Sequence, residues 1–169
     1  MSDNASSSAP TEEVVNPALR IMGQYVKDLS FEVPQAPDIF TLLRQQAPEI
    51  PTSIETDLRH LDGNSYEVTV SLHLEAFVAG KTAFIMELDY ACVVEIDDKR
   101  IPQEHLHPIL MIEVPRQLFP FVRQLVADMT MGGGFPPLMM QLVDFAEIYR
   151  RKFGVAIPRT DAPTSPTIN

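Results

Sequence analysis

Four stretches of this 169-residue chain alternate between apolar and polar side chains with a period of two, and this alternation limits the fold more than any other feature. A period of two places successive side chains on opposite faces of a β-strand. The turns at 61–64 (LDGN) and 79–81 (AGK) are short enough to join antiparallel neighbours. The four stretches are LRIMGQYVKDLSFEV (19–33), IPTSIETDLRH (50–60), SYEVTVSLHLEAFV (65–78) and TAFIMELDYACVVEI (82–96).

The alternation predicts an antiparallel sheet with one apolar face and one solvated face. In the first stretch it places Tyr25 on the apolar side with Leu29 and Phe31, and Gln24 on the solvated side. The acids expected on the solvated face are Asp28, Glu32, Glu55, Asp57, Glu67, Glu75, Glu87 and Asp89. Carboxylates opposed across strands destabilise a sheet, and a solvated face normally mixes lysines with its acids. The excess favours a docking surface for a basic partner; a face that only solvates the protein is the alternative.

After residue 100 the apolar pattern becomes helical. We expect a short helix that begins near Pro102 and is interrupted at Pro108, and a longer helix over 115–132. A last helix is expected after Asp144, which forms an N-terminal cap with Glu147. The apolar stripe of the long helix is wider than one sheet face needs, which indicates a second contact. Strands first and helices afterwards predict an α+β fold, a four-stranded antiparallel sheet with helices packed on one face.

Composition divides the chain into three parts. We expect a disordered leader over 1–17, one folded domain over 18–153 and a flexible tail over 154–169. No apolar run approaches the ~20 residues of a membrane-spanning helix, and the start of the chain lacks the pattern of a signal peptide. The one cysteine fits a reducing compartment, so we expect a cytoplasmic protein without membrane insertion. The net charge of −10 argues against a nucleic-acid partner.

Patterns for catalysis or metal binding are not found in the sequence. The histidines of 104–107 (EHLH) match no metal-site spacing, and the triple glycine at 132–134 lacks the Lys-Ser/Thr of a phosphate-binding loop. Cys92 lies on the expected apolar side of its strand, where packing is its simplest role. We therefore expect neither an enzyme nor a cofactor or metal.

The segment MGGGFPPLMM (131–140) combines a flexible Gly/Pro backbone with an aromatic ring and deformable methionines. Such a surface can repack around different partners, as promiscuous binding proteins require. Alternatively, Met139 and Met140 fill a gap under the last helix. Two rival functions also remain open: a binding module for small apolar ligands or a single peptide, with a closed pocket, and an unrecognised enzyme, with polar groups converging in a cleft.

Four segments together resemble SecB, the bacterial protein-export chaperone family. They are VKDLSFEVPQAPDIF (26–40), TAFIMEL (82–88), LFPFVR (118–123) and GGFPPLMMQLVDFAEIY (133–149). The likeness covers most of 25–149, and the SFE-x-P-x-A-P string is specific in combination with the FPPL block. Met140 stands where the family has another aliphatic residue, the segment after Phe40 is slightly longer, and the two ends of the chain do not match.

The resemblance implies an ATP-independent chaperone that holds unfolded precursor proteins in the cytosol and passes them to the motor ATPase SecA. It implies a homotetramer, a dimer of dimers, without nucleotide or metal. It also implies two binding surfaces: an acidic sheet face that docks the basic C-terminal segment of SecA, and a groove for precursors. The residues that match the SecA-binding surface are Asp28, Glu32, Ile85 and Glu87. The residues that match the precursor groove are Phe119, Phe121, Phe135, Leu138, Met140, Phe145 and Tyr149.

Overall fold

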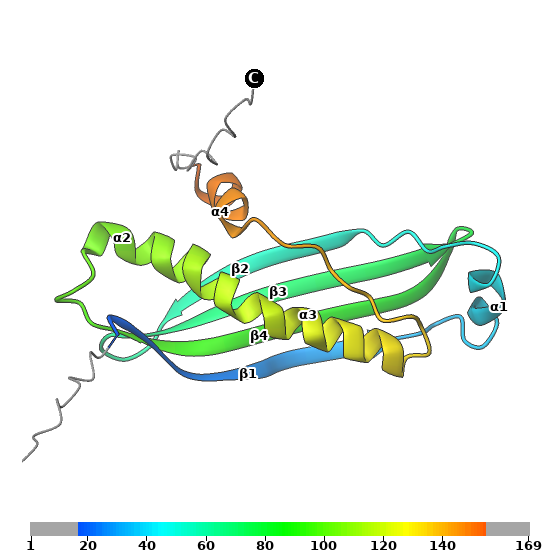
Figure 1. Ribbon diagram of the computed structural model, residues 1–169, viewed down its shortest axis with the longest axis horizontal. Coiled ribbons are helices and arrows are strands. Elements are labelled where there is room, and N and C mark those ends of the chain that lie inside the picture. The colour runs from blue at the N-terminus through cyan, green and yellow to red at the C-terminus, as the bar shows by residue number, and fades with distance from the viewer. Residues whose placement is uncertain (1–16, 155–169) are drawn as a thin grey trace, which may run out of the picture.

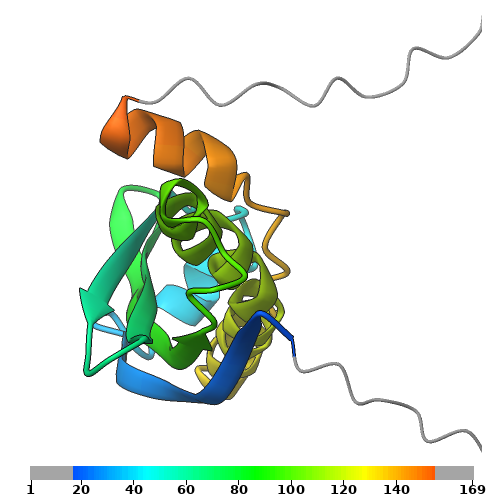
Figure 2. The same ribbon diagram turned by 90° about the vertical axis from the view of Figure 1, so that its left-hand side faces the viewer.

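The computed structural model describes residues 17–154, which form a four-stranded antiparallel sheet with helices on one side of it (Figures 1 and 2). The expected leader and tail therefore lie, apart from Pro17 and Gly154, outside the described residues. The elements are β1 (Leu19–Glu32), α1 (Ile39–Leu43), β2 (Thr52–His60), β3 (Ser65–Val78), β4 (Lys81–Ile96), α2 (Gln103–Pro108), the π-helical turn η1 (Ile109–Glu113), α3 (Val114–Gly132) and α4 (Phe145–Phe153).

The strands lie in the order β1-β4-β3-β2, and all neighbours are antiparallel, as the sequence predicted. The turn between β3 and β4 has positive φ at Ala79 and Gly80, the backbone twist that suits a two-residue hairpin. The predicted alternation of β3 and β4 is confirmed, because one side of this hairpin is almost completely buried. The buried side chains are Val68, Val70, Leu72 and Leu74 of β3 and Phe84, Met86, Leu88, Tyr90 and Cys92 of β4. We call the opposite side the outer face.

Two register shifts in β1, at Met22 and at Lys27, reverse the expected faces of the residues between them. The register between β1 and β4 shifts at Lys27, so that one more residue stands on β1 than on its partner. Tyr25 consequently lies opposite Ala91 on the outer face, and Gln24 lies opposite Cys92 on the covered face. A one-residue shift exchanges the two faces of a strand, so the predicted sides of Tyr25 and Gln24 were wrong.

The helical part forms one path over 103–132 instead of two separate helices. Pro108 is the last residue of α2 and Pro115 the second residue of α3, with η1 between them. A proline removes one hydrogen bond from a helix, and the π-helical turn changes the bonding pattern between the two prolines. As predicted, the first α-helix ends at Pro108 and the long one begins at Pro115 to within one residue and ends at Gly132, but the π-helical turn joins the two helices without a break in the helical path. Helix α1 had not been predicted.

Helix α3 crosses the covered face diagonally (Figure 1) and packs against β3 and β4. Leu118, Val122 and Val126 of this helix are completely buried. Each such side chain contributes roughly 1.5–3 kcal/mol relative to an exposed one, so this contact is the main stabilising layer of the fold. None of the helices within residues 17–154 is long and apolar enough to cross a membrane.

The loop after α3 is fixed by Thr130, which is completely buried. The Thr130 hydroxyl donates to the carbonyl of Val126 at 2.8 Å and accepts from the backbone N–H of Leu138 at 3.0 Å. The backbone N–H of Phe135 donates to the carbonyl of Thr130, also at 3.0 Å. The Gly/Pro segment is thus tied back onto the helix that precedes it.

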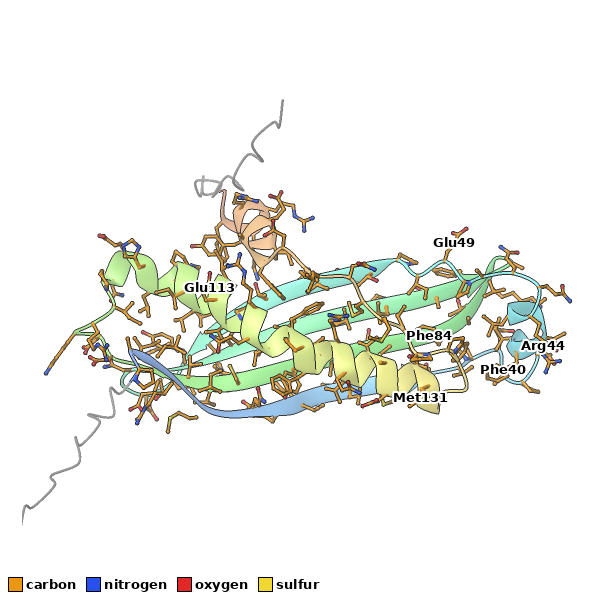
Figure 3. The ribbon with its side chains drawn as sticks, viewed as in Figure 1. Phe40, Arg44, Glu49, Phe84, Glu113 and Met131 are labelled. Carbon is orange, nitrogen blue, oxygen red and sulfur yellow. The ribbon has the colours of Figure 1, made fainter. Side chains whose placement is uncertain are left out.

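Phe135 lies in an aromatic cluster at the end of the molecule where α1 lies, which Figure 3 marks by Phe40 and Phe84. The ring centroid of Phe135 is 4.9 Å from that of Phe84 and 5.3 Å from that of Phe40. The Phe31 ring also belongs to the cluster, and its centroid is 6.3 Å from that of Phe135. A Cβ atom on Gly133 would lie only 2.3 Å from the Phe31 ring, so this glycine allows close packing instead of flexibility.

We predict that Gly133→Ala lowers the free energy of unfolding by about 1–3 kcal/mol, because its methyl group displaces the Phe31 ring from the cluster. The matched control is Gly132→Ala. No atom lies within 4 Å of the added Cβ there, so this change should be neutral or stabilise the helix by up to about 1 kcal/mol. Urea unfolding at a fixed protein concentration measures both. Equal stabilities of the two variants would contradict the prediction.

Candidate binding surfaces

Acidic side chains gather at one end of the outer face. The four residues expected to bind SecA lie together there, because β1 and β4 are neighbours and share one register in this part. The opposed residues are Glu32 with Ile85, Ser30 with Glu87 and Asp28 with Asp89. On the other side of β4, Glu75 of β3 stands opposite Ile85. Ile85, which is half-buried, is therefore bordered by the carboxylates of Glu32, Glu75 and Glu87.

We call this surface the acidic patch, and define it as Asp28, Glu32, Glu55, Glu75, Ile85, Glu87 and Asp89. Its one nearby imidazole among the described residues is His73, whose Nδ1 lies 3.3 Å from a Glu87 carboxylate oxygen. Like charges directly opposed across two strands, such as Asp28 and Asp89, destabilise the pairing. A positively charged partner would relieve this repulsion.

The other end of the outer face carries a neutralised carboxylate. Glu67 is only 3% exposed and accepts hydrogen bonds from the Tyr25 hydroxyl, from Arg59 Nε at 2.9 Å and from Lys27 Nζ at 3.1 Å. The hydrogen bond from Tyr25 and those from Arg59 and Lys27 stabilise the charged form and lower the pKa of Glu67 to about 2, although burial opposes this shift. Tyr25 and Lys27 belong to β1 and Glu67 to β3, so the cluster also ties the edge strand across β4.

The sequence had placed Glu67 among eight acids with few cations near them, whereas Glu67 is bonded by two cations and a tyrosine. The residue opposite Glu67 on β2 is Arg59, which counting along the predicted hairpin could have revealed. Tyr25 and Lys27 reach Glu67 because of the bulge at Lys27, for which the sequence gives no comparable signal. The outer face is thus divided into an acidic patch and a neutralised end.

An open groove with a volume of about 500 Å³ lies between the start of β2, the extended connection 138–144 and α4. Its apolar lining includes Ile50 and Ile54, Leu138, Met140 and Leu142, and Ile148. Leu142 is 85% exposed and Met139, which also borders the groove, 63% exposed. Exposed apolar side chains around a hollow are typical of a surface that binds a partner.

The seven residues expected in the precursor groove do not lie in one place. Leu138 and Met140 line the groove itself. Phe119 and Phe145 pack against each other with ring centroids 5.8 Å apart, and Tyr149 is buried on α4; Phe135 lies in the aromatic cluster described above. Phe121 is 47% exposed and does not line the groove; its ring stacks on that of Tyr90, with the ring centroids 6.3 Å apart.

The two most exposed apolar residues at the groove, Met139 and Leu142, were not among the seven residues matched to it. Met139 and Leu142 follow the conspicuous FPPL block, and no local pattern marks them: Leu142 stands in alternation with half-buried Leu138 and buried Met140 but is itself exposed. Of the two methionines, Met140 is 8% exposed and fills space under the connection, whereas Met139 does not. The gap-filling alternative therefore describes Met140 only.

The side chains considered for metal or covalent chemistry take part in packing. The Nδ1 of His107, in α2, lies 2.8 Å from the Tyr149 hydroxyl, and this contact helps to hold α4 against α2. Cys92 is completely buried, and this burial raises the pKa of its thiol to about 11, which keeps it protonated. Within the described residues, His, Cys, Asp and Glu form no group of three or more that could hold a metal ion.

Comparison with known proteins identifies the family of this chain. The model of the family described as "Preprotein translocase subunit SecB" matches residues 12–155. The chain belongs to the SecB family. Two relatives named "Protein-export protein SecB" are those of Paramagnetospirillum magneticum, 45% identical over 146 residues (86% of this chain and 91% of the relative), and Rhodospirillum rubrum, 48% identical over 138 residues (82% and 84%).

A solved structure also resembles the fold. It is a SecB-like chaperone of Mycobacterium tuberculosis in complex with a ChAD peptide from an antitoxin, with a TM-score of 0.63 at 18% identity over 75% of this chain and 91% of that one. The predicted α+β fold of the SecB type is confirmed. Family membership and the relatives support the function predicted from the sequence, a protein-export chaperone.

We predict that the Glu67 cluster makes stability depend on acid. The pKa of Glu67 is about 2 in the folded chain and near its ordinary value of 4.5 in the unfolded one, so the stabilisation is complete above pH 4.5 and is lost as the pH falls toward 2. Between neutral pH and about pH 3, the wild type should lose on the order of 2 kcal/mol more than Glu67→Gln. Tyr25→Phe, which lacks the main hydrogen bond, should be intermediate. Parallel pH profiles in chemical unfolding would contradict this.

Proposed function

We propose that this SecB-family chaperone holds unfolded precursor proteins in an export-competent state in the cytoplasm and delivers them to SecA, by binding alone and without ATP. The observation that carries the proposal is the separation of two surfaces with different chemistry. The open apolar groove lies beside β2 and α4, and the acidic patch lies on the outer face around β1 and β4. A chaperone that hands over its client needs both surfaces at the same time.

The groove suits unfolded polypeptide because its contacts are apolar, shallow and adaptable. Each large apolar side chain that becomes buried contributes roughly 1.5–3 kcal/mol, from which the cost of ordering the client is subtracted, so several contacts together give useful affinity. The related chaperone of Mycobacterium tuberculosis was solved with a bound peptide, and we infer a similar capacity here. A pocket for a small apolar ligand would enclose it, whereas Leu142 at this groove is 85% exposed.

We further propose that four copies of the chain assemble as a dimer of dimers. Ile21, Met22 and Val26 of β1 are 37%, 59% and 43% exposed. Val26 stands opposite Tyr90, on which the exposed ring of Phe121 stacks, so the apolar surface continues from β1 to α3. Continuous patches of this kind mark subunit interfaces.

Light scattering should give a mass near four times 18.9 kDa, and a stable monomer at micromolar concentration would refute the assembly.

The groove prediction concerns client holding. Met139→Ser combined with Leu142→Ser should weaken binding of unfolded clients about tenfold or more, because two exposed apolar contacts are lost. The assay is suppression of aggregation of a chemically unfolded, unrelated protein in the absence of nucleotide. The matched control is Met131→Ser, which removes a 59% exposed apolar side chain at the end of α3 that does not line the groove. Equal activity of the double variant and the control would exclude the groove as the client site.

The acidic-patch prediction concerns SecA. Glu87→Lys should abolish binding of the basic C-terminal segment of SecA and leave client holding unchanged. Glu104→Lys, the same charge change on α2, should bind the segment like the wild type. Exposed ion pairs contribute about 1 kcal/mol or less each, so binding should rest on several of them and weaken strongly above physiological salt. Calorimetric titration of the segment measures this. Binding that is insensitive to salt, or wild-type affinity in Glu87→Lys, would show that the acidic patch is not the SecA-binding site.

A further inference from the structure

We propose that Met139 is a site of reversible oxidation by peroxide: its thioether forms an apolar wall of the groove, whereas its sulfoxide turns toward Arg123 and weakens client binding. This inference rests on the client-binding function proposed above. It adds a chemical control of the same groove, and it depends on residues that the comparison with the family did not select.

Met139 is the most exposed methionine of the described residues. It is 63% exposed, against 59% for Met22 and for Met131, which lies at the end of α3 (Figure 3). Met140, the next residue in the sequence, is only 8% exposed. An oxidant must reach the sulfur atom to react with it, so Met139 should be oxidised and Met140 protected.

Met139 borders two hollows of different chemistry. The first is the groove, where it stands among apolar side chains such as Leu138 and Leu142. The second is a hollow of about 250 Å³ over α3, which is lined also by Pro120, Arg123, Gln124 and Ala127. A change in the polarity of the Met139 side chain therefore changes which of the two hollows suits it better.

Arg123 brings an unused hydrogen-bond donor to the second hollow. Its Nε is buried and has no hydrogen-bond partner among the described residues. A buried donor without an acceptor is unfavourable, and an acceptor that enters the hollow would relieve this cost. The thioether of Met139 cannot do so effectively, because its sulfur is a weak acceptor.

Oxidation changes the Met139 side chain from apolar to polar. The thioether sulfur attacks one oxygen of hydrogen peroxide, so that an S–O bond forms and the O–O bond breaks. The second oxygen leaves as hydroxide, takes up the proton of the transferred oxygen and becomes water; the sulfur is oxidised by two electrons and the peroxide is reduced. The sulfoxide is polar and disrupts apolar contacts. It is disfavoured in the groove, and its oxygen can accept from the Arg123 guanidinium.

Cys92 does not compete with Met139 for the oxidant. It is the one cysteine of the chain, and it is completely buried. Burial also raises the pKa of its thiol to about 11, so that the thiolate, which is the reactive form, is scarce. A response of the protein to dilute peroxide is therefore a response of its methionines.

Peroxide treatment of the full-length chain tests the inference. Mass spectrometry of peptides measures oxidation at each methionine, and the affinity for a chemically unfolded, unrelated protein is measured before and after treatment. Met139 should be oxidised at least about fivefold faster than Met140, and the affinity should fall about threefold to tenfold. Methionine sulfoxide reductases for both sulfoxide epimers, supplied with a dithiol, return the oxygen as water and should restore the affinity.

Substitutions separate Met139 from the other exposed methionines. Each variant is compared only with itself, before and after oxidation. The affinity of Met139→Leu should change less than about twofold on oxidation, whereas Met22→Leu combined with Met131→Leu, which keeps Met139, should lose as much as the wild type. An equal loss in Met139→Leu, or unchanged affinity of the wild type with Met139 fully oxidised, would overturn the inference and leave client binding in place. Failure of the reduced wild type to bind unfolded protein would contradict client binding itself, and the inference with it.

Nuclear magnetic resonance of isotope-labelled methionine methyl groups locates the oxidised side chain without a variant that could fail to fold. On oxidation the Met139 methyl group should gain contacts with Pro120 and Ala127, which line the second hollow, and lose contacts with Leu142. A sulfoxide that keeps its contacts with Leu142 and gains none with the second hollow would overturn the turn toward Arg123.

Discussion

The core-facing side chains of β3 and β4 are almost completely buried against α3, and the placement of every other element depends on this contact. Along a strand, burial of one face leaves every second side chain on the opposite face. Covering one face with a single long helix therefore leaves the outer face to solvent and the two edge strands, β1 and β2, with one unpaired side each. The same contact that stabilises the chain thus leaves the outer face and the two edge strands available to partners.

Each of these surfaces carries a feature that does not favour stability. Asp28 and Asp89 are opposed like charges, and Leu142 is a large apolar side chain exposed to water. Where the outer face has no proposed partner, a carboxylate is instead neutralised: Glu67 is held by Tyr25 and two cations. The contrast between the two ends of one sheet face supports a role in binding for the acidic patch. It also limits the length of the basic segment that the patch can accept.

The sequence predicted those parts of the structure that follow from local periodicity. Strict alternation in β3 and β4 gave the faces of the sheet, and the short turns gave its antiparallel pairing. The bulge at Lys27 could not be predicted, because an inserted residue changes the period only where tertiary contacts require it. The end of α2 at Pro108 followed from the proline, but the π-helical turn that continues the path to α3 could not be predicted from it. The glycines after α3 suggested flexibility, but Gly133 makes room for the ring of Phe31, which belongs to the distant strand β1.

The acidic patch could be located from strand pairing. The groove depends on how the connection 138–144 returns over the sheet, which no local pattern determines.

The central claim is that client and motor bind to separate surfaces of one small sheet, so that a client can be handed over without first being released. The most direct measurement is a calorimetric titration of the C-terminal segment of SecA into the chaperone, once free and once saturated with an unfolded client. The account predicts the same affinity, within about twofold, and a stable complex of all three components, because the acidic patch and the groove share no residue. Displacement of the client by the segment, or loss of the segment's binding in the presence of client, would show that the two partners compete for one surface and would contradict the account.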